Sequence, residues 1–358
     1  MKERIYVCHT FYHVYVALLK EFQYIKERDG KATIVLSRMS NDFGDIDARL
    51  KASGVLEDVI WFDEKRTEFF PELSVYKVKS ANFFKAIYNR IKFTKKLADL
   101  EEKYIPVDFR EYKDIYVFCD SDPIGYYLNQ RKIKYHAVED GLDTLVHVDE
   151  ARYDNRRFFG LKRFLSEKLN LIFIQNGYGK YCVDMEVNNI SRIPYPCHKY
   201  VELPRAELVQ ALEDSEKEIL LKIFIKDIDR LMEVLGSDKT NPENKTALIL
   251  TEPLCDLETR KRIFEDIIEK YCKNMHVYIK PHPRDELDYD ECFGQYNVLN
   301  KQIPMELLNF LPGVSFDVVY AVLTVIDGIQ FAKEKVRLGS DFMDKYEDPI
   351  IHRQNEQI

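Results

Sequence analysis

The feature that most constrains the fold is a repeated alternation of short, nearly uninterrupted apolar runs with stretches of helical periodicity. Helical patterns separate consecutive runs in the first half and again in the second, so the expected strands pair in parallel in doubly wound sheets. Runs without polar alternation are typical of strands that are covered on both faces. The expected strands span residues 5–8, 32–37, 58–62, 114–119, 135–140, 171–176, 246–251, 276–280 and 318–324.

The chain is long enough for two such domains, since its 358 residues allow each half to bury its own core. A long charged helical stretch, about residues 205–235, ends in the polar, breaker-rich segment GSDKTNPENK, after which the strand–helix pattern starts again. We therefore expect an N-terminal α/β domain with a helical linker over residues 1–238 and a C-terminal α/β domain over residues 239–358. Two such domains facing each other across a cleft are found in several enzyme classes, dehydrogenases among them.

Composition limits the possible functions. Apolar residues make up 46% and charged residues 32%, as in ordinary soluble proteins, and the net charge of −8 argues against a nucleic-acid partner. The seven cysteines form no CxxC pair, which suggests a reducing compartment. Cys272 and His276 have the spacing of metal ligands on a helix, but no second pair completes a site, so no metal is expected.

The N-terminus has a basic start followed by apolar residues, as a signal peptide does. His9, Thr10 and His13 interrupt this run, and no small-residue cleavage site follows it. A strand, a turn and a helix that begins near Thr10 fit better. No run of 18 apolar residues occurs, so no membrane span is expected and a cytoplasmic location is predicted.

Candidate site residues follow the expected strands, because ligands in open α/β sheets bind at the carboxyl ends of the strands. Glu139, Asp140 and Gly141 close one strand, and the glycine permits a tight turn that exposes the acids. Repulsion between adjacent carboxylates can raise one pKa toward the range of a general base. The alternative is a solvated turn, since Asp-Gly is a common turn pair.

A second candidate is His282, which lies between Pro281 and Pro283 just past a strand. The prolines stiffen the backbone, so the imidazole is expected to project from a rigid loop. A positioned imidazole can serve as a general acid, and the adjacent Arg284 can bind a phosphate or carboxylate. The alternative is a structural turn in which the histidine caps a neighbour.

Two further segments supply candidates for nucleotide binding. Pro304 is expected to start a helix with Glu306 in its first turn, where a carboxylate suits the helix dipole and can accept hydrogen bonds from ribose hydroxyls. Thr324 is expected near the start of a helix that begins at about Ile326, where free N–H groups form an anion site. The alternatives are a plain N-terminal acid and a hydroxyl that caps the next helix.

These candidates divide between the two halves. A possible base lies in the first half, and a possible acid with phosphate-binding groups lies in the second. This division is typical of an inverting group transfer with the acceptor on the N-terminal domain and an anionic donor on the C-terminal domain.

The ordered motifs resemble bacterial sialyltransferases of glycosyltransferase family 52, which includes lipooligosaccharide sialyltransferases and related capsule enzymes. The segments that carry the resemblance are VCHTFYHVYVAL, VEDGLDTL, IKPHPRDELDY, IPMELLNF and GIQFAKEKVRLGSDFMDKY. The resemblance touches both halves in the expected order. It implies a GT-B-like fold, CMP-sialic acid as donor, a glycan acceptor that can be lipid-linked, inversion at the anomeric carbon and no obligatory metal.

The resemblance also implies roles for individual residues. The general base is Asp140 or, as the close alternative, Glu139, and His282 protonates or hydrogen-bonds the departing CMP phosphate. Further nucleotide-binding positions are Pro283, Arg284, Pro304, Glu306, Thr324 and Thr251, and the acceptor-side positions are His9, Thr10, His13 and Gly141.

Two departures from the family pattern leave alternatives open. Leu323 precedes Thr324 where the family often has two hydroxyl residues, and His13 stands where an amide is expected. One missing hydrogen bond to a charged group costs roughly 1.5–3 kcal/mol, which weakens donor binding without abolishing it. The alternatives are an α-glucosyltransferase or another CMP- or UDP-sugar transferase, and a non-catalytic nucleotide-sugar-binding relative.

Two basic, aromatic-rich segments, residues 82–97 and 156–169, admit two interpretations. One is peripheral attachment to an anionic inner leaflet, and the other is a solvated helix face with its apolar side in the core. The sequence favours the second. The family includes dimers, but no segment of this chain identifies an interface.

Overall fold

The computed structural model describes residues 1–27, 30–78, 82–118, 120–141, 144–146, 158–236 and 245–352. The chain divides into two compact units, Met1–Leu212 and Glu213–Ile358. Each unit contains one parallel sheet. The division falls before most of the charged helical stretch, whereas the sequence places the boundary near Asp238, which lies outside the described residues.

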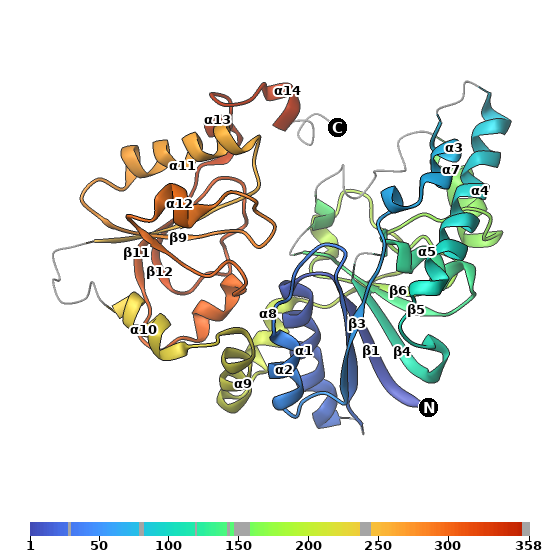
Figure 1. The fold of residues 1–358 in the computed structure, drawn as a ribbon, viewed down its shortest axis with the longest axis horizontal. Helices are drawn as coiled ribbons and strands as arrows, with labels where there is room; N and C mark the ends of the chain where they lie inside the picture. Colours follow the sequence, from blue (N-terminus) through green and yellow to red (C-terminus); the bar gives the residue numbers. More distant parts are fainter. Residues whose placement is uncertain are drawn as a thin grey trace. The chain divides into compact units, whose positions relative to one another are not determined.

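The first unit is built around a seven-stranded sheet in the order β3-β2-β1-β4-β5-β6-β7 (Figure 1). All neighbouring strands pair in parallel. The order reverses between β1 and β4, so the topological switch point lies at the carboxyl ends of these two strands. The strands are β1 (Lys2–Cys8), β2 (Ala32–Ser37), β3 (Asp58–Phe62), β4 (Tyr112–Phe118), β5 (Tyr135–Val138), β6 (Cys182–Val187) and β7 (Tyr200–Glu202).

Helices cover both faces of this sheet, which explains why its strands are apolar throughout. The helices α1, α2 and α8 lie on one face, and α4 and α5 lie on the other (Figure 1). The bounds are α1 (Phe11–Glu27), α2 (Ile46–Ala52), α3 (Ser74–Lys77), α4 (Phe83–Glu101), α5 (Pro123–Gln130), α7 (Phe159–Arg163), the following π-helix η6 (Phe164–Lys168) and α8 (Arg205–Gln210).

The second unit repeats the arrangement with five parallel strands in the order β10-β9-β8-β11-β12. Its switch point lies between β8 and β11. The strands are β8 (Thr246–Leu250), β9 (His276–Lys280), β10 (Asn297–Val298), β11 (Phe316–Ala321) and β12 (Ala332–Arg337). The helices are α9 (Asp214–Phe224), α10 (Ile228–Gly236), α11 (Leu257–Tyr271), α12 (Tyr289–Phe293), the 3-10 helix η9 (Met305–Phe310), α13 (Gly339–Met343) and α14 (Pro349–His352).

The prediction of a strand over residues 171–176 was wrong. The side chains of Ile172 and Ile174 are buried as the pattern suggests. The backbone, however, bonds to side chains instead of a neighbouring strand: Ile174 N–H donates to Ser166 Oγ (3.2 Å) and Asn176 N–H to Asp120 Oδ1 (2.7 Å). The strand that pairs with β5 is β6, which the sequence did not predict.

The helix expected from about Ile326 is also absent. The chain turns after β11 and then forms the edge strand β12, whose alternating lysine and glutamate residues are typical of a protected sheet edge. The single charged helical stretch is resolved into three helices, α8, α9 and α10. The other eight expected strands are confirmed within a few residues at each end.

Candidate active site

In the first unit, polar side chains from five segments gather at the carboxyl edge of the sheet. The segments end or follow β1 to β5, including both strands of the switch point. The side chains belong to His9, Ser37, Glu64, Asp122 and Asp140. Hydrogen bonds connect them into two clusters, one around Asp140 and one around His9.

Asp140 is held by the buried ring of His13, which is in the first turn of α1. The Nδ1 atom of His13 accepts a hydrogen bond from the backbone N–H of His9 (3.0 Å), so in the neutral ring the proton is on Nε2. This Nε2–H lies 2.7 Å from Asp140 Oδ1 and 2.9 Å from Asp140 O. Burial lowers the pKa of His13 despite the nearby carboxylate, which favours the neutral ring. The ring also stacks on Phe118, with centroids 4.6 Å apart.

Glu139 and Asp140, adjacent in sequence, have opposite surroundings. Glu139 is 2% exposed, and its two carboxylate oxygens accept the backbone N–H groups of Leu145 (3.1 Å) and Asn188 (2.8 Å). The side chain of Asp140 is 33% exposed. The geometry therefore favours Asp140 as the group that can reach a ligand and Glu139 as a structural residue.

His9 forms the second cluster with two acids. Its Nε2 atom lies 2.7 Å from Glu64 Oε2 and 3.4 Å from Asp122 Oδ2. Burial alone lowers the pKa of His9, but the two carboxylates outweigh burial and raise the pKa to about 9. Burial raises the pKa of Asp122 to about 7, opposed by His9. The two acids therefore favour the charged form of His9, while burial favours the neutral form of Asp122.

The sequence did not identify Glu64 or Asp122. Glu64 follows an expected strand by two residues, in WFDEK, and Asp122 follows one by three, in FCDSDP; this position was the available signal. Glu64 is the hub of the cluster, because it also accepts hydrogen bonds from Ser37 Oγ (2.7 Å) and the Ile124 N–H (2.9 Å). The Nδ1 atom of His9 is buried and has no hydrogen-bond partner within the described ranges.

The other acceptor-side predictions have structural roles in this unit. Thr10 Oγ1 accepts the N–H of His13 (3.1 Å) at the start of α1 and so helps to position the ring. A Cβ atom on Gly141 would lie 2.9 Å from Thr144 Oγ1, so only glycine fits there without rearrangement.

In the second unit, His282 is fixed by its own loop. Its N–H donates to Thr251 Oγ1 (3.0 Å), a hydroxyl at the end of β8. Its Nδ1 atom accepts the N–H of Arg284 (3.1 Å), which again leaves the proton of the neutral ring on Nε2. Burial lowers the pKa of His282 to about 4, helped by the charges of Arg284 and Lys280. His282 is therefore a neutral hydrogen-bond donor at pH 7.

A buried carboxylate holds the loop beyond His282. Asp285 is buried and accepts hydrogen bonds from Arg260 Nη1 (2.5 Å), Tyr289 OH (2.8 Å) and the Leu287 N–H (3.0 Å). Charge-assisted bonds of this kind are strong and directional. They attach the Pro-His-Pro-Arg turn to α11 and α12.

Glu306 lies in the first turn of η9, next to a buried lysine. Pro304 is the N-terminal flanking residue of η9, so the expected helix start is confirmed, although the helix is of the 3-10 type. Burial raises the pKa of Glu306, opposed by Lys280. Burial lowers the pKa of Lys280 to about 7, and its Nζ donates to the carbonyls of Pro281 (3.0 Å) and Lys301 (3.2 Å).

The segment around Thr324 differs from the predicted anion site at a helix start. The carboxylate of Glu252, which is buried just past β8, accepts the N–H groups of Leu323 (2.9 Å) and Thr324 (2.7 Å). The sequence predicted that backbone N–H groups of this segment form an anion site for a phosphate. An acidic side chain of the chain itself thus occupies the anion position at the second switch point.

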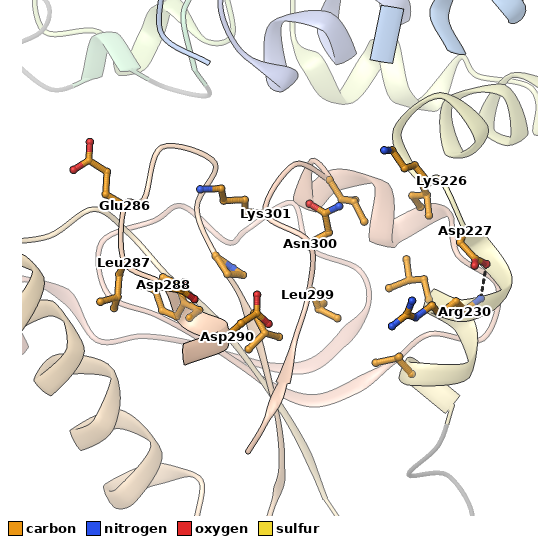
Figure 2. A pocket seen from close by; sticks show the side chains of 17 residues that line it. Lys226, Asp227, Arg230, Glu286, Leu287, Asp288, Asp290, Leu299, Asn300 and Lys301 are labelled. Carbon is orange, nitrogen blue, oxygen red and sulfur yellow. Dashed lines mark hydrogen bonds between the residues drawn. The ribbon is translucent and has the colours of Figure 1, made fainter. Parts of the chain in front are cut away.

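Cavities lie among the described residues of the second unit. One has a volume of about 690 Å³, within the range of small-molecule sites, and adjoins the carboxyl ends of β9 and β10. Its charged lining includes Lys226, Glu286 and Lys301 (Figure 2). A second cavity of about 430 Å³ is lined by Arg260 and Arg284. Arg284 thus borders open space, as expected for a ligand-binding arginine.

One group of potential metal ligands is present within the described segments. Atoms of Glu167, Cys197 and His198 lie within 4.8 Å of one another. The guanidinium of Arg163 already donates to Glu167 Oε2 (2.9 Å) and His198 Nδ1 (2.9 Å). An arginine therefore supplies the positive charge in this group.

Similarity to known proteins covers most of the chain. The model of Glycosyltransferase family 52 matches residues 58–330. An uncharacterized protein of Haemophilus influenzae is 30% identical over 129 residues, which span 35% of this chain and 38% of that protein. The sialyltransferase of Photobacterium damsela has a similar structure, with a TM-score of 0.52 and 12% identity over 98% of this chain and 78% of that one. An α/β-galactoside α-2,3-sialyltransferase of Photobacterium phosphoreum gives a TM-score of 0.49 and 12% identity over 90% of this chain and 86% of that one.

Proposed function

Because the chain belongs to glycosyltransferase family 52 and has the GT-B fold, we propose that it is an inverting glycosyltransferase that uses CMP-sialic acid. The proposed acceptor is a terminal galactose-type hydroxyl of a lipooligosaccharide or capsule glycan. Family membership supports a nucleotide-sugar donor and a glycan acceptor. The choice of CMP and of sialic acid is the proposal, to be tested by donor selectivity.

The observation that carries the proposal is the orientation of Asp140 by His13. The Nε2–H of His13 orients the partly exposed carboxylate of Asp140, which in our proposal accepts the proton of the acceptor hydroxyl. The hydroxyl oxygen then bonds to the anomeric carbon as the bond from that carbon to the phosphate oxygen breaks. The electron pair of the broken bond leaves with CMP, and a single displacement inverts the configuration.

His282 is proposed to stabilise the leaving phosphate. Its neutral Nε2–H can donate a hydrogen bond to a phosphate oxygen without any prior proton uptake. Because Nδ1 already accepts the Arg284 N–H, the ring acts in our proposal as a neutral hydrogen-bond donor to the leaving phosphate and transfers no proton to it. Preorganised donors of this kind replace a divalent cation in our proposal, so EDTA should leave turnover unchanged.

The remaining donor contacts follow from the second unit. Glu306 is proposed to bind the ribose hydroxyls, and Thr251 acts through its bond to the N–H of His282. Thr324 and Arg284 are the proposed phosphate contacts. Glu252 must release the backbone N–H of Leu323 or of Thr324 if that N–H group is also to bind the phosphate.

The first test is a calorimetric panel of CMP, CDP, UDP and GDP with the wild type and with His282→Ala, followed by turnover with CMP-sialic acid. We expect CMP-selective binding that weakens in the variant by about tenfold or more, as for the loss of one hydrogen bond to a charged group. Selective binding of UDP would contradict CMP-sialic acid as the donor and would support the α-glucosyltransferase alternative. Binding of CMP without turnover would identify a non-catalytic relative.

A further inference from the structure

Exposed aromatic side chains gather on two helical segments of the first unit. Phe84 is 81% exposed and Tyr88 56% exposed in α4, and Phe158 is 67% exposed and Phe164 51% exposed in α7 and its flanks. Phe83 and Leu161 are exposed as well. Phe and Tyr side chains bury large areas in most folds, so an exposed group of them indicates an interaction surface.

The two segments form one continuous surface. The rings of Phe83 and Phe158 lie 5.6 Å apart and those of Phe83 and Phe84 lie 5.8 Å apart. Behind them, Ile91 of α4 packs on the same small core as Phe159 of α7. Figure 1 shows α4 and α7 next to each other on this side of the first unit. We call the exposed side chains of Phe83, Phe84, Tyr88, Phe158, Leu161 and Phe164 the aromatic face.

This arrangement agrees only in part with the interpretation that the sequence favoured, because Ile91 and Phe93 of α4 pack against core side chains while Phe84 and Tyr88 do not. A solvated helix would turn its aromatic residues into the core. The residues that α4 buries are instead Asn89, Thr94, Leu97, Ala98 and Glu101, which include no aromatic side chain. Phe84 and Tyr88 are four positions apart and therefore share one face of α4, and that face is exposed.

The charges beside the aromatic face are positive, against the net charge of −8 of the whole chain. The first 16 residues of α4 contain no acid and five basic residues, Lys85, Arg90, Lys92, Lys95 and Lys96. In α7 and η6, Lys162, Arg163 and Lys168 accompany a single acid, Glu167, which is paired with Arg163 at 2.9 Å. Arg156 and Arg157 lie outside the described residues.

We infer that the aromatic face docks on an anionic lipid surface. Aromatic rings enter the boundary between headgroups and acyl chains, while long basic side chains reach the anionic headgroups around them. Lys85 and Lys92 lie on the same side of α4 as Phe84 and Tyr88, and Lys92 Nζ lies 5.5 Å from the centroid of the Tyr88 ring. The two attractions therefore act on the same membrane surface.

Flotation of the full chain with vesicles tests the inference. We expect binding to phosphatidylcholine vesicles with 25% phosphatidylglycerol, weak binding to pure phosphatidylcholine, and loss of binding at high salt. Phe84→Ala/Tyr88→Ala and Lys85→Glu/Lys92→Glu should each weaken partitioning by about tenfold or more. The matched control Lys270→Glu/Lys273→Glu makes the same charge change in the second unit, at and just beyond the C-terminal end of α11, and should bind like the wild type.

Three outcomes overturn the inference: no vesicle binding by the wild type, equal binding to both vesicle types, or equal loss in the control. Sedimentation velocity of the same proteins tests whether a second copy of the chain, instead of a lipid surface, binds the aromatic face. A wild-type dimer that becomes a monomer in Phe84→Ala/Tyr88→Ala, without any vesicle binding, identifies a homodimer interface. Vesicle binding needs no donor or acceptor. The chain can therefore bind vesicles without transferring sialic acid, and it can transfer sialic acid without binding vesicles.

Discussion

Asp140 and Glu139 provide the sharpest test at the scale of single residues. Asp140→Asn keeps an oxygen for the His13 hydrogen bond but cannot take up a proton, so turnover should fall by about 100-fold or more with little change in melting temperature. Glu139→Gln places an amide N–H₂ against one of two backbone N–H groups, so the free energy of unfolding should fall by about 1–3 kcal/mol. Turnover assays and urea unfolding on both variants measure these effects. Lost turnover in a stable Glu139→Gln with activity retained in Asp140→Asn would reverse the two roles.

His9 should make stability depend on pH in the alkaline range. Its pKa rises to about 9 in the folded chain, above the usual value of the unfolded state, because the carboxylates of Glu64 and Asp122 outweigh burial. The stabilisation is fully present below about pH 6.5 and is lost as the pH rises through about 9. Urea unfolding of the wild type and His9→Asn from pH 6 to 10 should therefore give a difference that shrinks with pH. Taking the difference removes the titration of groups that do not interact with His9, and a difference that stays constant would contradict the charged form of His9.

At the scale of elements, the carboxylate of Glu252 binds the turn after β11, where the sequence predicted the start of a helix. Glu252→Ala leaves the N–H groups of Leu323 and Thr324 without their acceptor, so the free energy of unfolding should fall by about 1–3 kcal/mol. Glu258→Ala, an exposed acid in the first turn of α11, is the matched control and should change stability by less than about 1 kcal/mol. Chemical denaturation measures both, and equal effects in the two variants would show that Glu252 does not hold this turn.

The elements that the sequence predicted wrongly have a common cause. The run at residues 171–176 is apolar enough for a strand, but Asp120 and Ser166 take its backbone N–H groups. The turn after β11 depends on Glu252, which is 71 or 72 positions away in sequence. Hydrophobic periodicity reports burial correctly in both segments, yet it carries no information about distant side chains that accept backbone hydrogen bonds.

At the scale of the whole molecule, the two units should respond differently to nucleotide. In our proposal CMP binds to the second unit, so hydrogen exchange should slow in residues 246–324 and change least in residues 1–118. At 100 times Kd the stabilisation of the binding unit is about 2.7 kcal/mol. Exchange measured by mass spectrometry with CMP, and with GMP as the control, tests this. Protection confined to the first unit would contradict the division of donor and acceptor.

The sequence alone predicted part of the fold and part of the candidate site. Repeated strands and helices were sufficient for two parallel sheets. The positions after strands made Asp140 and His282 candidates, and the family resemblance added His9 and His13. Glu64 and Asp122 were missed, because two acids after different strands gain meaning only when a sheet brings them to the same histidine. The exposure of Phe84 was not predicted either, since an amphipathic pattern places aromatic side chains on the side of the helix that faces the core.

The bond between the His9 N–H and the Nδ1 atom of His13 has a consequence for the proton that Asp140 takes up. A ring that passes protons onward must be able to release one from its far nitrogen, and here that nitrogen is already an acceptor of a backbone hydrogen bond. The His13 ring therefore holds Asp140 in position and does not conduct protons away from it. In our proposal the proton therefore leaves after each turnover through the exposed third of the Asp140 side chain directly into bulk water, so we expect the rate at which the base is restored to depend on the surrounding buffer.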